Sequence, residues 1–565
     1  MSLSKKPEGK SVWQWLRWPV VVLVIGGIMI AATPGNSSLF EITKNLDIYT
    51  SIYRELNTYY VDDVDPNSLM REGVDAMLES LDPYTSYISE AEMENHRFQV
   101  TGKYGGIGAV IRKIEGDITV IEPYEGFAAF KAGLLAGDKI LNIDGKDVTD
   151  KNTDQISEIL RGSPGTEVRV AVDRPYTEGN VELTLVREEI KVDNVPYYGR
   201  VGANNDIGYI RLTQFTENAG QNVANALRDL KAERGLSGVI LDLRGNPGGL
   251  LREAVNVSNV FIPKGELIVS TRGKVKEWDR SFKTLNPAVD TDIPVAVLIN
   301  RSSASASEIV AGVIQDLDRG IIIGERSFGK GLVQSTRDIP YKTKLKVTTA
   351  KYYTPSGRCI QAIDYSSRND DGSVGKIPDS LMAKFSTRNG RAVYDGGGVS
   401  PEVKVNPGEY GQITITLLRK NHIFNYATKY RAEHEEGVDA RGFELTDADW
   451  VDFKDFLEGK DYRYTTSSER VLDELVEATE DERYFDSIES SLESLRSKLA
   501  GEKDTDVDKF RKEISEQLVT EIVGRYHYQK GSIESAFAFD PDLKEALRLL
   551  ESPGEVELLL IPSQD

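Results

Sequence analysis

Apolar runs alternate with helical patterns between residues 193 and 406, and this alternation constrains the fold more than any other feature of the chain. The runs 237–243, 294–299 and 320–324 are apolar almost throughout, as in strands that are covered on both faces. Residues 207–215 form another candidate strand, and the predicted helices are 218–232, 253–261 and 305–317. This order predicts α/β packing, with helices on the faces of a sheet.

Residues 98–192 show a different pattern, in which β-type runs are separated by Gly and Asp turns. The predicted strands are 108–114, 118–121, 139–143, 167–172 and 181–187, with one short helix at 154–161. The block begins with Gly105-Gly106-Ile107-Gly108. On its own this sequence is typical of an ordinary glycine-rich hairpin turn.

The two ends of the chain differ from these blocks. Residues 1–39 include the uncharged segment 18–34 behind a basic flank, which predicts an uncleaved membrane anchor or, as the alternative, a cleaved signal peptide. Residues 40–97 show helical periodicity. Residues 407–565 are acidic and helical, and we expect a solvated helical extension, with partner binding or self-assembly into a homo-oligomer as the alternative.

Composition excludes several kinds of chemistry. The chain has 69 Lys and Arg against 90 Asp and Glu, a formal net charge of −21, which argues against a nucleic-acid partner. Its single cysteine and four histidines, no two at HExxH spacing, argue against a disulfide framework or a zinc site. We therefore expect no metal and no cofactor.

Two loops that follow predicted strands carry small residues. In Leu243-Arg244-Gly245-Asn246-Pro247-Gly248-Gly249, glycines free backbone N–H groups for a ligand, although a purely conformational turn explains the loop equally simply. The run from Ser302 to Glu308 holds four serines among alanines. Ser305 and Glu308 fit a capping box, so a nucleophile and a helix cap are equally favoured at Ser305.

A third loop, Ser327-Phe328-Gly329-Lys330-Gly331-Leu332-Val333-Gln334, places a lysine among glycines and apolar residues. A surface lysine is the default, but desolvation here would lower its pKa and allow it to act as a base. Gln334 would face the same side if the segment is extended. No histidine occurs between residues 97 and 421, so a Ser-Lys pair is more economical than a Ser-His-Asp triad. Paired-carboxylate chemistry, for instance at Asp316 and Asp318, receives little weight.

Taken in this order, the three loops resemble those of the C-terminal processing (tail-specific) serine peptidases, peptidase family S41, with an inserted PDZ domain. The motifs are LDLRGNPGG, SASASEI and FGKGLVQ, and the serine and lysine are 330 − 305 = 25 residues apart, as is usual in the family. Ser302 and Gly245 depart from common family residues without removing a catalytic group. The resemblance covers roughly residues 40–406 and implies an α/β S41 (ClpP/crotonase-like) core at 193–406 and a β-rich PDZ domain at 98–192.

The resemblance also implies roles for individual residues. Ser305 would be the nucleophile, Lys330 the general base and Gln334 the residue that holds the lysine. The oxyanion hole would comprise the N–H of Ala306 and of Gly248 or Gly249. The tail-binding loop of the PDZ domain would be formed by Gly105, Gly106, Ile107 and Gly108.

We therefore expect a serine endopeptidase that binds protein substrates by their C-terminal tails in the bacterial cell envelope. It would be anchored in the inner membrane facing the periplasm, or secreted to the periplasm if the N-terminal segment is cleaved. The alternatives are a membrane-tethered PDZ adaptor with a vestigial protease site and an unrelated crotonase-like enzyme that binds acyl-CoA.

Overall fold

The computed structural model describes residues 35–562 apart from 234, 369–372, 407 and 504, and it divides into two compact units, residues 1–87 and 88–565. The predicted anchor at 18–34 lies outside the described residues. Within the described ranges, no helix has the length and apolar character needed to cross a bilayer. The first unit contains α2 (Gly35–Tyr59) and α3 (Pro66–Glu79), and β1 (Ser86–Ile88) lies at the division between the units.

The second unit begins with α4 (Met93–Thr101), followed by a small β domain built around one sheet in the order β3-β4-β5-β7-β8. Its elements are β2 (Lys103–Gly106), β3 (Ala109–Ile114), β4 (Asp117–Pro123), α5 (Ala128–Lys131), β5 (Lys139–Ile143), β6 (Lys146–Asp147), α6 (Thr153–Leu160), β7 (Glu167–Asp173), β8 (Asn180–Val186) and β9 (Glu188–Lys191). Five strands and one helix match the predicted ranges within two residues at each end. Because β3 is at the edge of the sheet path, one side of this strand is available for pairing.

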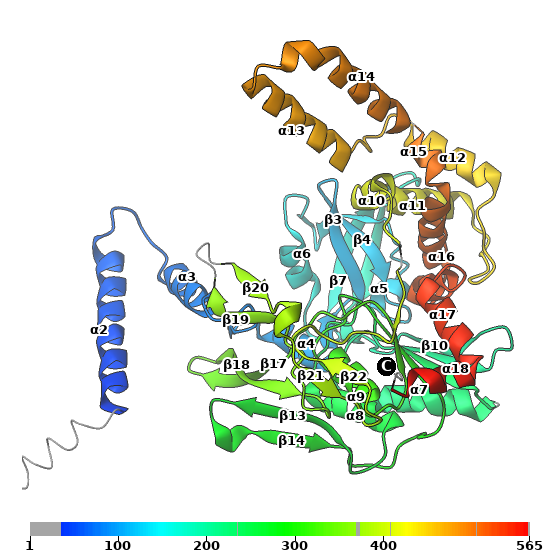
Figure 1. The fold of residues 1–565 in the computed structure, drawn as a ribbon. Coiled ribbons are helices and arrows are strands. Elements are labelled where there is room, and N and C mark those ends of the chain that lie inside the picture. The colour runs from blue at the N-terminus through cyan, green and yellow to red at the C-terminus, as the bar shows by residue number, and fades with distance from the viewer. Residues whose placement is uncertain (1–34, 234, 369–372, 407, 504, 563–565) are drawn as a thin grey trace, which may run out of the picture. The chain divides into compact units, whose positions relative to one another are not determined.

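The central sheet of the second unit has the order β10-β11-β12-β15-β16-β23. Its strands are β10 (Tyr197–Val201), β11 (Ile207–Arg211), β12 (Gly238–Asp242), β15 (Val295–Ile299), β16 (Ile321–Gly324) and β23 (Val403–Lys404). From β11 to β23 all neighbouring strands are parallel. The predicted alternation therefore gives the predicted α/β sheet (Figure 1).

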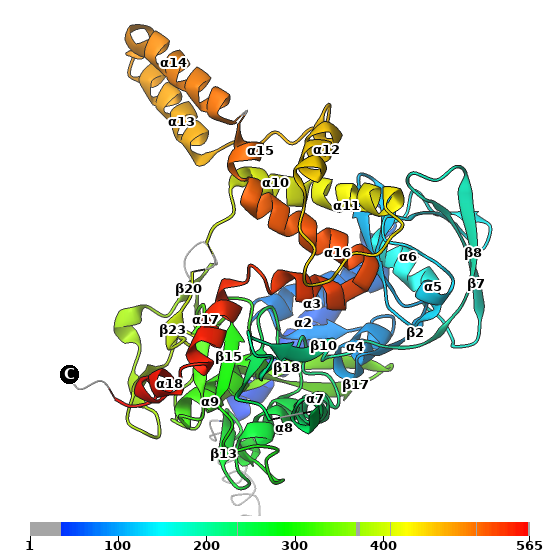
Figure 2. The same ribbon diagram turned by 90° about the vertical axis from the view of Figure 1, so that its right-hand side faces the viewer.

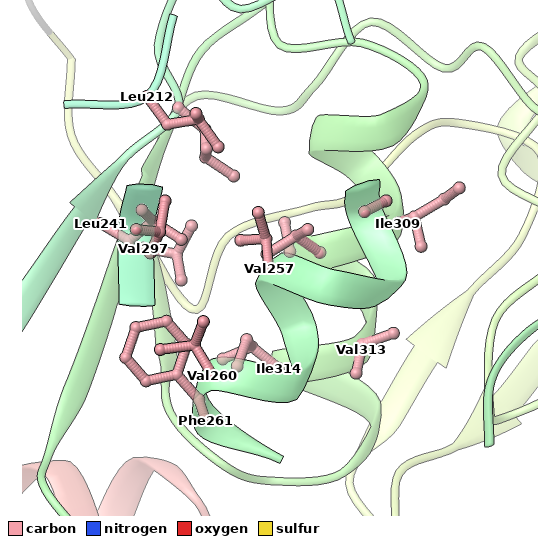
Figure 3. Close-up of a cluster of buried hydrophobic side chains, with 14 of the residues drawn as sticks. Leu212, Leu241, Val257, Val260, Phe261, Val297, Ile309, Val313 and Ile314 are labelled. Carbon is pink, nitrogen blue, oxygen red and sulfur yellow. The ribbon is translucent and has the colours of Figure 1, made fainter. Parts of the chain in front are cut away.

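One face of this sheet is covered by the helices that connect its strands, α7 (Ala219–Glu233), α8 (Leu251–Phe261) and α9 (Ala306–Asp316). Figure 3 shows strand residues Leu241 and Val297 facing Val257 and Phe261 of α8, and Ile309 of α9 belongs to the same cluster. All five side chains are buried. These contacts join the helices to the sheet in one hydrophobic core.

The opposite face is covered by the last helices of the chain, α17 (Pro541–Leu550) and α18 (Pro553–Leu559). Leu543 and Leu550 of α17 are buried in one cluster with Ile240 and Leu298 from the sheet, and Figure 2 shows α17 beside β15. A parallel sheet needs apolar cover on both faces. The end of the acidic extension, expected to be solvated, supplies that cover for the central sheet.

The second unit also contains a second sheet, in which β18 pairs with β17 and with β13, and β13 pairs with β14. Its elements are β13 (Leu267–Gly273), the short 3-10 helix η1 (Lys276–Trp278), β14 (Arg280–Lys283), β17 (Leu332–Ile339) and β18 (Thr343–Tyr353). Two hairpins and a further 3-10 turn complete this part: β19 (Ile363–Arg368), β20 (Val374–Lys376), η2 (Asp379–Leu381), β21 (Lys384–Ser386) and β22 (Ala392–Tyr394).

The rest of the C-terminal extension is helical, as predicted. Its helices are α10 (Gln412–Arg419), α11 (His422–Glu433), α12 (Asp447–Leu457), α13 (Ser467–Asp481), α14 (Phe485–Lys503), α15 (Asp506–Lys509) and α16 (Arg511–Ala536). They have a core of their own around Tyr426, Phe453 and Leu518. The extension also contacts the β domain, where Arg112 donates a hydrogen bond to Asn421 at 2.9 Å.

Candidate active site

Each of the three loops singled out in the sequence follows the carboxyl end of a parallel strand. The loop 243–250 follows β12, the loop 300–305 follows β15, and the loop 325–331 follows β16. Since β12, β15 and β16 are adjacent and parallel, their carboxyl ends meet at one edge of the sheet, where open α/β sheets place their ligand sites. The topology thus brings the three motifs together.

Ser305 occupies a strained position at the start of α9. Its φ of 55° and ψ of −109° lie in a region that residues other than glycine rarely adopt, a kind of strain that clusters at functional sites. Its carbonyl accepts a hydrogen bond from the Tyr352 hydroxyl at 3.0 Å, and its N–H donates to the Glu308 carboxylate at 2.8 Å. Ser305 is therefore the N-cap residue of α9. Its side chain is only half-buried, so the N-cap position does not conflict with the predicted role as nucleophile.

Two neighbouring serines have structural partners. The hydroxyl of Ser303 donates to the carbonyl of Leu243 at 2.9 Å, and that of Ser307 donates to the carbonyl of Asn246, also at 2.9 Å. Both serines are fully buried. They connect the serine loop to the loop after β12, so two of the four serines in this run have a structural role.

The Glu308 carboxylate links the serine loop to the lysine loop. Its Oε2 accepts the N–H of Ser305 and the N–H of Lys330, each at 2.8 Å. Its Oε1 accepts the N–H of Gly329 at 2.7 Å and the hydroxyl of Ser327 at 2.5 Å. One fully buried carboxylate thereby fixes the backbone of both predicted catalytic residues.

Opposing effects act on the ionisation of Glu308. Burial raises the pKa of its carboxyl above the ordinary value, while the hydrogen bonds from Ser327, Lys330, Ser305 and Gly329 act in the opposite direction. Sequence reasoning assigned Glu308 only to a capping box. Its place three residues after the serine was the available signal, but the contacts to residues 327–330 depend on the fold.

Gly248 lies directly against the serine loop. A Cβ atom at this position would be 2.9 Å from both the Cβ of Ser305 and the N of Ala306, and the φ of +100° favours glycine as well. The N–H of Gly248 donates to Oδ1 of Asn246 at 2.9 Å. Gly249 has a φ of +146° and is exposed. Of the three predicted oxyanion-hole residues, Gly248 and Ala306 are thus adjacent to Ser305, and Gly249 follows Gly248 in the chain.

The buried Asn246 organises this arrangement. Its Nδ2 donates to the carbonyl of Leu212 at 2.8 Å, and its own carbonyl accepts the N–H of Ala304 at 3.0 Å. The asparagine in the motif therefore joins the loop after β12 to β11 and to the serine loop.

Arg244, in the same loop, contacts the opposite side of the sheet. Its guanidinium bonds to the carboxylates of Asp242 at 2.7 Å, Asp540 at 2.6 Å and Asp542 at 2.8 Å. The charges of Arg211 and Arg244 hold the pKa of Asp242 well below its usual range against the effect of burial. Sequence analysis did not find this network, because Asp540 and Asp542 belong to the acidic extension and no local pattern pairs them with Arg244.

Lys330 is half-buried beside Gly329, whose φ is +89°. Lys330 lies before β17, and Gln334 lies within it. The extended segment that was assumed to run from Lys330 to Gln334 therefore begins only at Leu332. Nε2 of Gln334 donates to the Thr348 hydroxyl at 3.2 Å. The expected role of Gln334 in holding the lysine stays a prediction.

Two other acidic residues considered in the sequence have arginine partners. Asp316 pairs with Arg358 at 2.8 Å and Asp318 with Arg391 at 2.7 Å, and all four side chains are at most 10% exposed. These contacts support the low weight given to a catalytic carboxylate pair.

The predicted tail-binding residues divide between a strand and a loop. Gly105 and Gly106 belong to β2, which pairs with β9, and a Cβ at Gly105 would lie 2.3 Å from the carbonyl oxygen of Gly162. Ile107 is buried and Gly108, with a φ of +76°, leads into β3. Of the four predicted tail-binding residues, Gly105 and Gly106 thus lie in a paired strand, and Ile107 and Gly108 form the link to β3.

Comparisons with known proteins agree with this architecture. Family models match for peptidase family S41 at residues 206–367, for a PDZ domain at 105–185, and for the C-terminal helical domain of PDZ-proteases at 413–550. A carboxy-terminal-processing protease of Bartonella bacilliformis is 40% identical over 323 residues, which cover 57% of this chain and 73% of that protein. The chain belongs to peptidase family S41.

Further relatives agree with this assignment. A CtpA-like serine protease of Staphylococcus haemolyticus is 30% identical over 79% of this chain and 83% of its own length. The carboxy-terminal processing protease CtpA of Bacillus subtilis is 30% identical over 68% of this chain and 82% of its own length. The protein is thus a serine-type peptidase with the S41 fold, a PDZ domain and a helical C-terminal domain, which confirms the predicted family and fold class.

Proposed function

We propose that this S41 peptidase is an endopeptidase that hydrolyses peptide bonds with a Ser305–Lys330 dyad. One observation supports it above the others: the N–H groups of both residues donate to the same Oε2 atom of Glu308, each at 2.8 Å. Two loops that follow different strands are thereby held in a fixed relation. A nucleophile and its base need this kind of preorganisation.

In the proposed reaction, the neutral amine of Lys330 takes the proton of the Ser305 hydroxyl as Oγ attacks the substrate carbonyl. The N–H of Ala306 and that of a glycine in the loop after β12 stabilise the oxyanion. Because Gly248 already donates to Asn246, Gly249 is favoured as the second donor. Lys330 then returns the proton to the leaving amine, and water hydrolyses the acyl-enzyme.

Tail capture by the PDZ domain is the second part of the proposal. β3 is an edge strand, and α6 lies beside it, so an extended peptide has a strand to pair with and a helix on its other side. The N–H groups around Ile107 and Gly108 would receive the C-terminal carboxylate. Apolar C-terminal residues are the expected ligands.

Cleavage assays on a protein with an apolar C-terminal tail test the dyad. Wild type should cleave it, whereas Ser305→Ala and Lys330→Met should lose nearly all activity while keeping the wild-type circular dichroism spectrum. Equal cleavage by wild type and Ser305→Ala would contradict the proposal. If wild type binds the tail without cleaving it, the alternative of a PDZ adaptor with a vestigial site is favoured.

We further propose an envelope location with an N-terminal membrane anchor, supported by the uncharged segment 18–34 and its basic flank. Fractionation of cells that express the full chain should recover it with the membranes, and deletion of residues 1–39 should release it. Recovery of the full chain in the soluble cytoplasmic fraction would contradict this location.

A further inference from the structure

A pocket of about 500 Å³ lies next to the proposed catalytic site, on one face of the second sheet. We call it the arginine pocket. Its lining residues are Leu250, Leu251, Arg252, Thr271, Gly273, Trp278, Arg280, Phe282, Val333, Ser335, Arg337, Thr349 and Ala350. Strand pairing shows that they share a face: Thr271 is opposite Arg280, Gly273 is opposite Ala350, and Ala350 is opposite Val333.

This face of the sheet is the one that contacts the nucleophile. Tyr352 is the cross-strand partner of Thr271, so the two side chains lie on the same face, and the Tyr352 hydroxyl donates to the carbonyl of Ser305. The pocket is also close along the chain to both other catalytic loops. Leu250 directly follows Gly249, and Val333 is three residues after Lys330. A peptide bound at Ser305 therefore has this pocket within reach.

The chemistry of the pocket combines an apolar floor with positive charge. Leu250, Leu251, Phe282 and Val333 are partly buried, and three arginines surround them. Among the described residues that line the pocket, none is acidic, although the chain as a whole has a formal net charge of −21.

Two of these arginines lack a carboxylate partner within the described part of the chain. Arg280 donates to the backbone carbonyls of Glu277 and Asp279 at 2.7 and 2.9 Å, and the Arg337 guanidinium lies 4.6 Å from the centre of the Trp278 ring. The nearby carboxylate of Asp279 accepts the N–H of Gly273.

Arg252, by contrast, pairs with Glu217 at 3.0 Å. Arg280 and Arg337 are thus oriented by backbone and ring contacts, and their charge is not neutralised by an ion pair.

We infer that the arginine pocket is a substrate subsite that binds an aspartate or glutamate side chain, with an adjoining apolar side chain, near the scissile bond. This inference rests on the proposed function. If the PDZ domain holds the C-terminal carboxylate of the substrate, the carboxylate that reaches this pocket during cleavage belongs to a side chain. A guanidinium group that is not neutralised by an ion pair is well suited to bind it.

Kinetics on matched peptides test the subsite. All peptides carry the same apolar C-terminal tail, so PDZ capture is constant, and the segment around the scissile bond contains Glu in one peptide and Gln in the other. Wild type should cleave the Glu peptide with a kcat/KM about three- to tenfold higher, as expected for charge-assisted bonds to partly exposed arginines. The preference should shrink in 1 M NaCl.

Variants locate the preference. Arg280→Gln/Arg337→Gln should cleave the Gln peptide like wild type but lose the preference for Glu. The matched control is Arg272→Gln, since Arg272 lies between Thr271 and Gly273 on β13, faces the other side of the sheet and stacks on Tyr353 at 4.4 Å. This control should keep the preference.

The outcomes separate the two proposals. Equal cleavage of both peptides by wild type, or a preference that survives in the double variant, overturns the subsite. If short peptides without Glu are cleaved faster with a free C-terminal carboxylate than with a C-terminal amide, and Arg280→Gln/Arg337→Gln abolishes that difference, the arginines bind the terminal carboxylate and the side-chain subsite is overturned. Absence of cleavage of every peptide by wild type would instead contradict the proposed function.

Discussion

The two faces of the central sheet are covered in different ways. One face is covered by α7, α8 and α9, each of which connects neighbouring strands, and the other by α17 and α18, which come from the end of the chain. Both faces converge on the loop 243–249. Gly248 of this loop touches the serine loop of the first face, and Arg244 bonds to Asp540 and Asp542 at the start of α17.

This difference teaches that one short motif serves two purposes. Gly248 allows a close backbone approach to the serine loop, where a Cβ would lie 2.9 Å from the Cβ of Ser305. Its arginine joins the catalytic core to the C-terminal domain through a largely buried charge network. The first function predicts loss of activity on substitution, and the second predicts loss of stability.

The largest expected effect is on the side of α17. Arg244→Met removes the cation from three carboxylates and should lower the free energy of unfolding by about 3–5 kcal/mol, the usual cost of breaking a buried ion pair. Urea unfolding followed by circular dichroism measures it. Arg548→Met is the control. Arg548 lies on α17, like Asp542, but its side chain is half-exposed, so its loss should leave the unfolding midpoint nearly unchanged. Equal midpoints for the two variants would contradict the role of Arg244.

On the catalytic side, Gly248→Ala should lower kcat/KM by about 10²–10³-fold, because the added Cβ would displace Ala306, whose N–H is a proposed oxyanion donor. The added Cβ would lie 2.7 Å from the carbonyl oxygen of Ala304 and 2.9 Å from the N of Ala306. Gly245→Ala is the matched control: its φ is also positive, at +71°, but the nearest atom to its Cβ is 3.9 Å away.

Both substitutions carry the strain of a positive φ, and Gly248→Ala adds the clash with residues 304–306, so Gly248→Ala should also lose more stability. At a temperature well below both melting temperatures, where both variants are folded, only Gly248→Ala should lose most of its activity. Peptide hydrolysis at that temperature measures the difference. Comparable activity losses in the two variants would show that backbone strain, and not the approach to Ser305, determines the effect.

The same comparison explains which features could be predicted from sequence. The strands and helices of the first face follow local periodicity, and the motifs around Ser305 and Lys330 are adjacent because parallel strands end at one edge. The cover of the second face was missed, because Leu543 and Leu550 lie in an acidic segment whose partners, Ile240 and Leu298, are distant in the chain.

Within the site, the same limit applies. The capping-box pattern already accounts for Glu308, and its bonds to Gly329 and Lys330 leave no additional pattern in the sequence that could be recognised. The strained φ of Ser305 likewise depends on the packing around it. Local patterns identify the loops, whereas the contacts that fix one loop against another require the fold.

The smallest expected effect concerns pH and the second face. Burial raises the pKa of Asp542 above its ordinary value despite the opposing charge of Arg244, and its Oδ1 is buried without a hydrogen-bond partner among the described residues. A carboxyl whose folded-state pKa is raised contributes stability that is fully present below its unfolded pKa and is lost as pH rises through the folded value. Asp542→Asn removes this contribution while its amide oxygen can still accept from Arg244. Between pH 7 and pH 4, wild type should therefore gain stability relative to Asp542→Asn, measured as the difference between their urea midpoints. Asp242, whose pKa is held low, changes stability with pH in the opposite direction, but it does so in both proteins and therefore cancels from the difference. If the difference between the two urea midpoints stays constant from pH 7 to pH 4, Asp542 remains ionised and paired with Arg244, and the prediction is wrong.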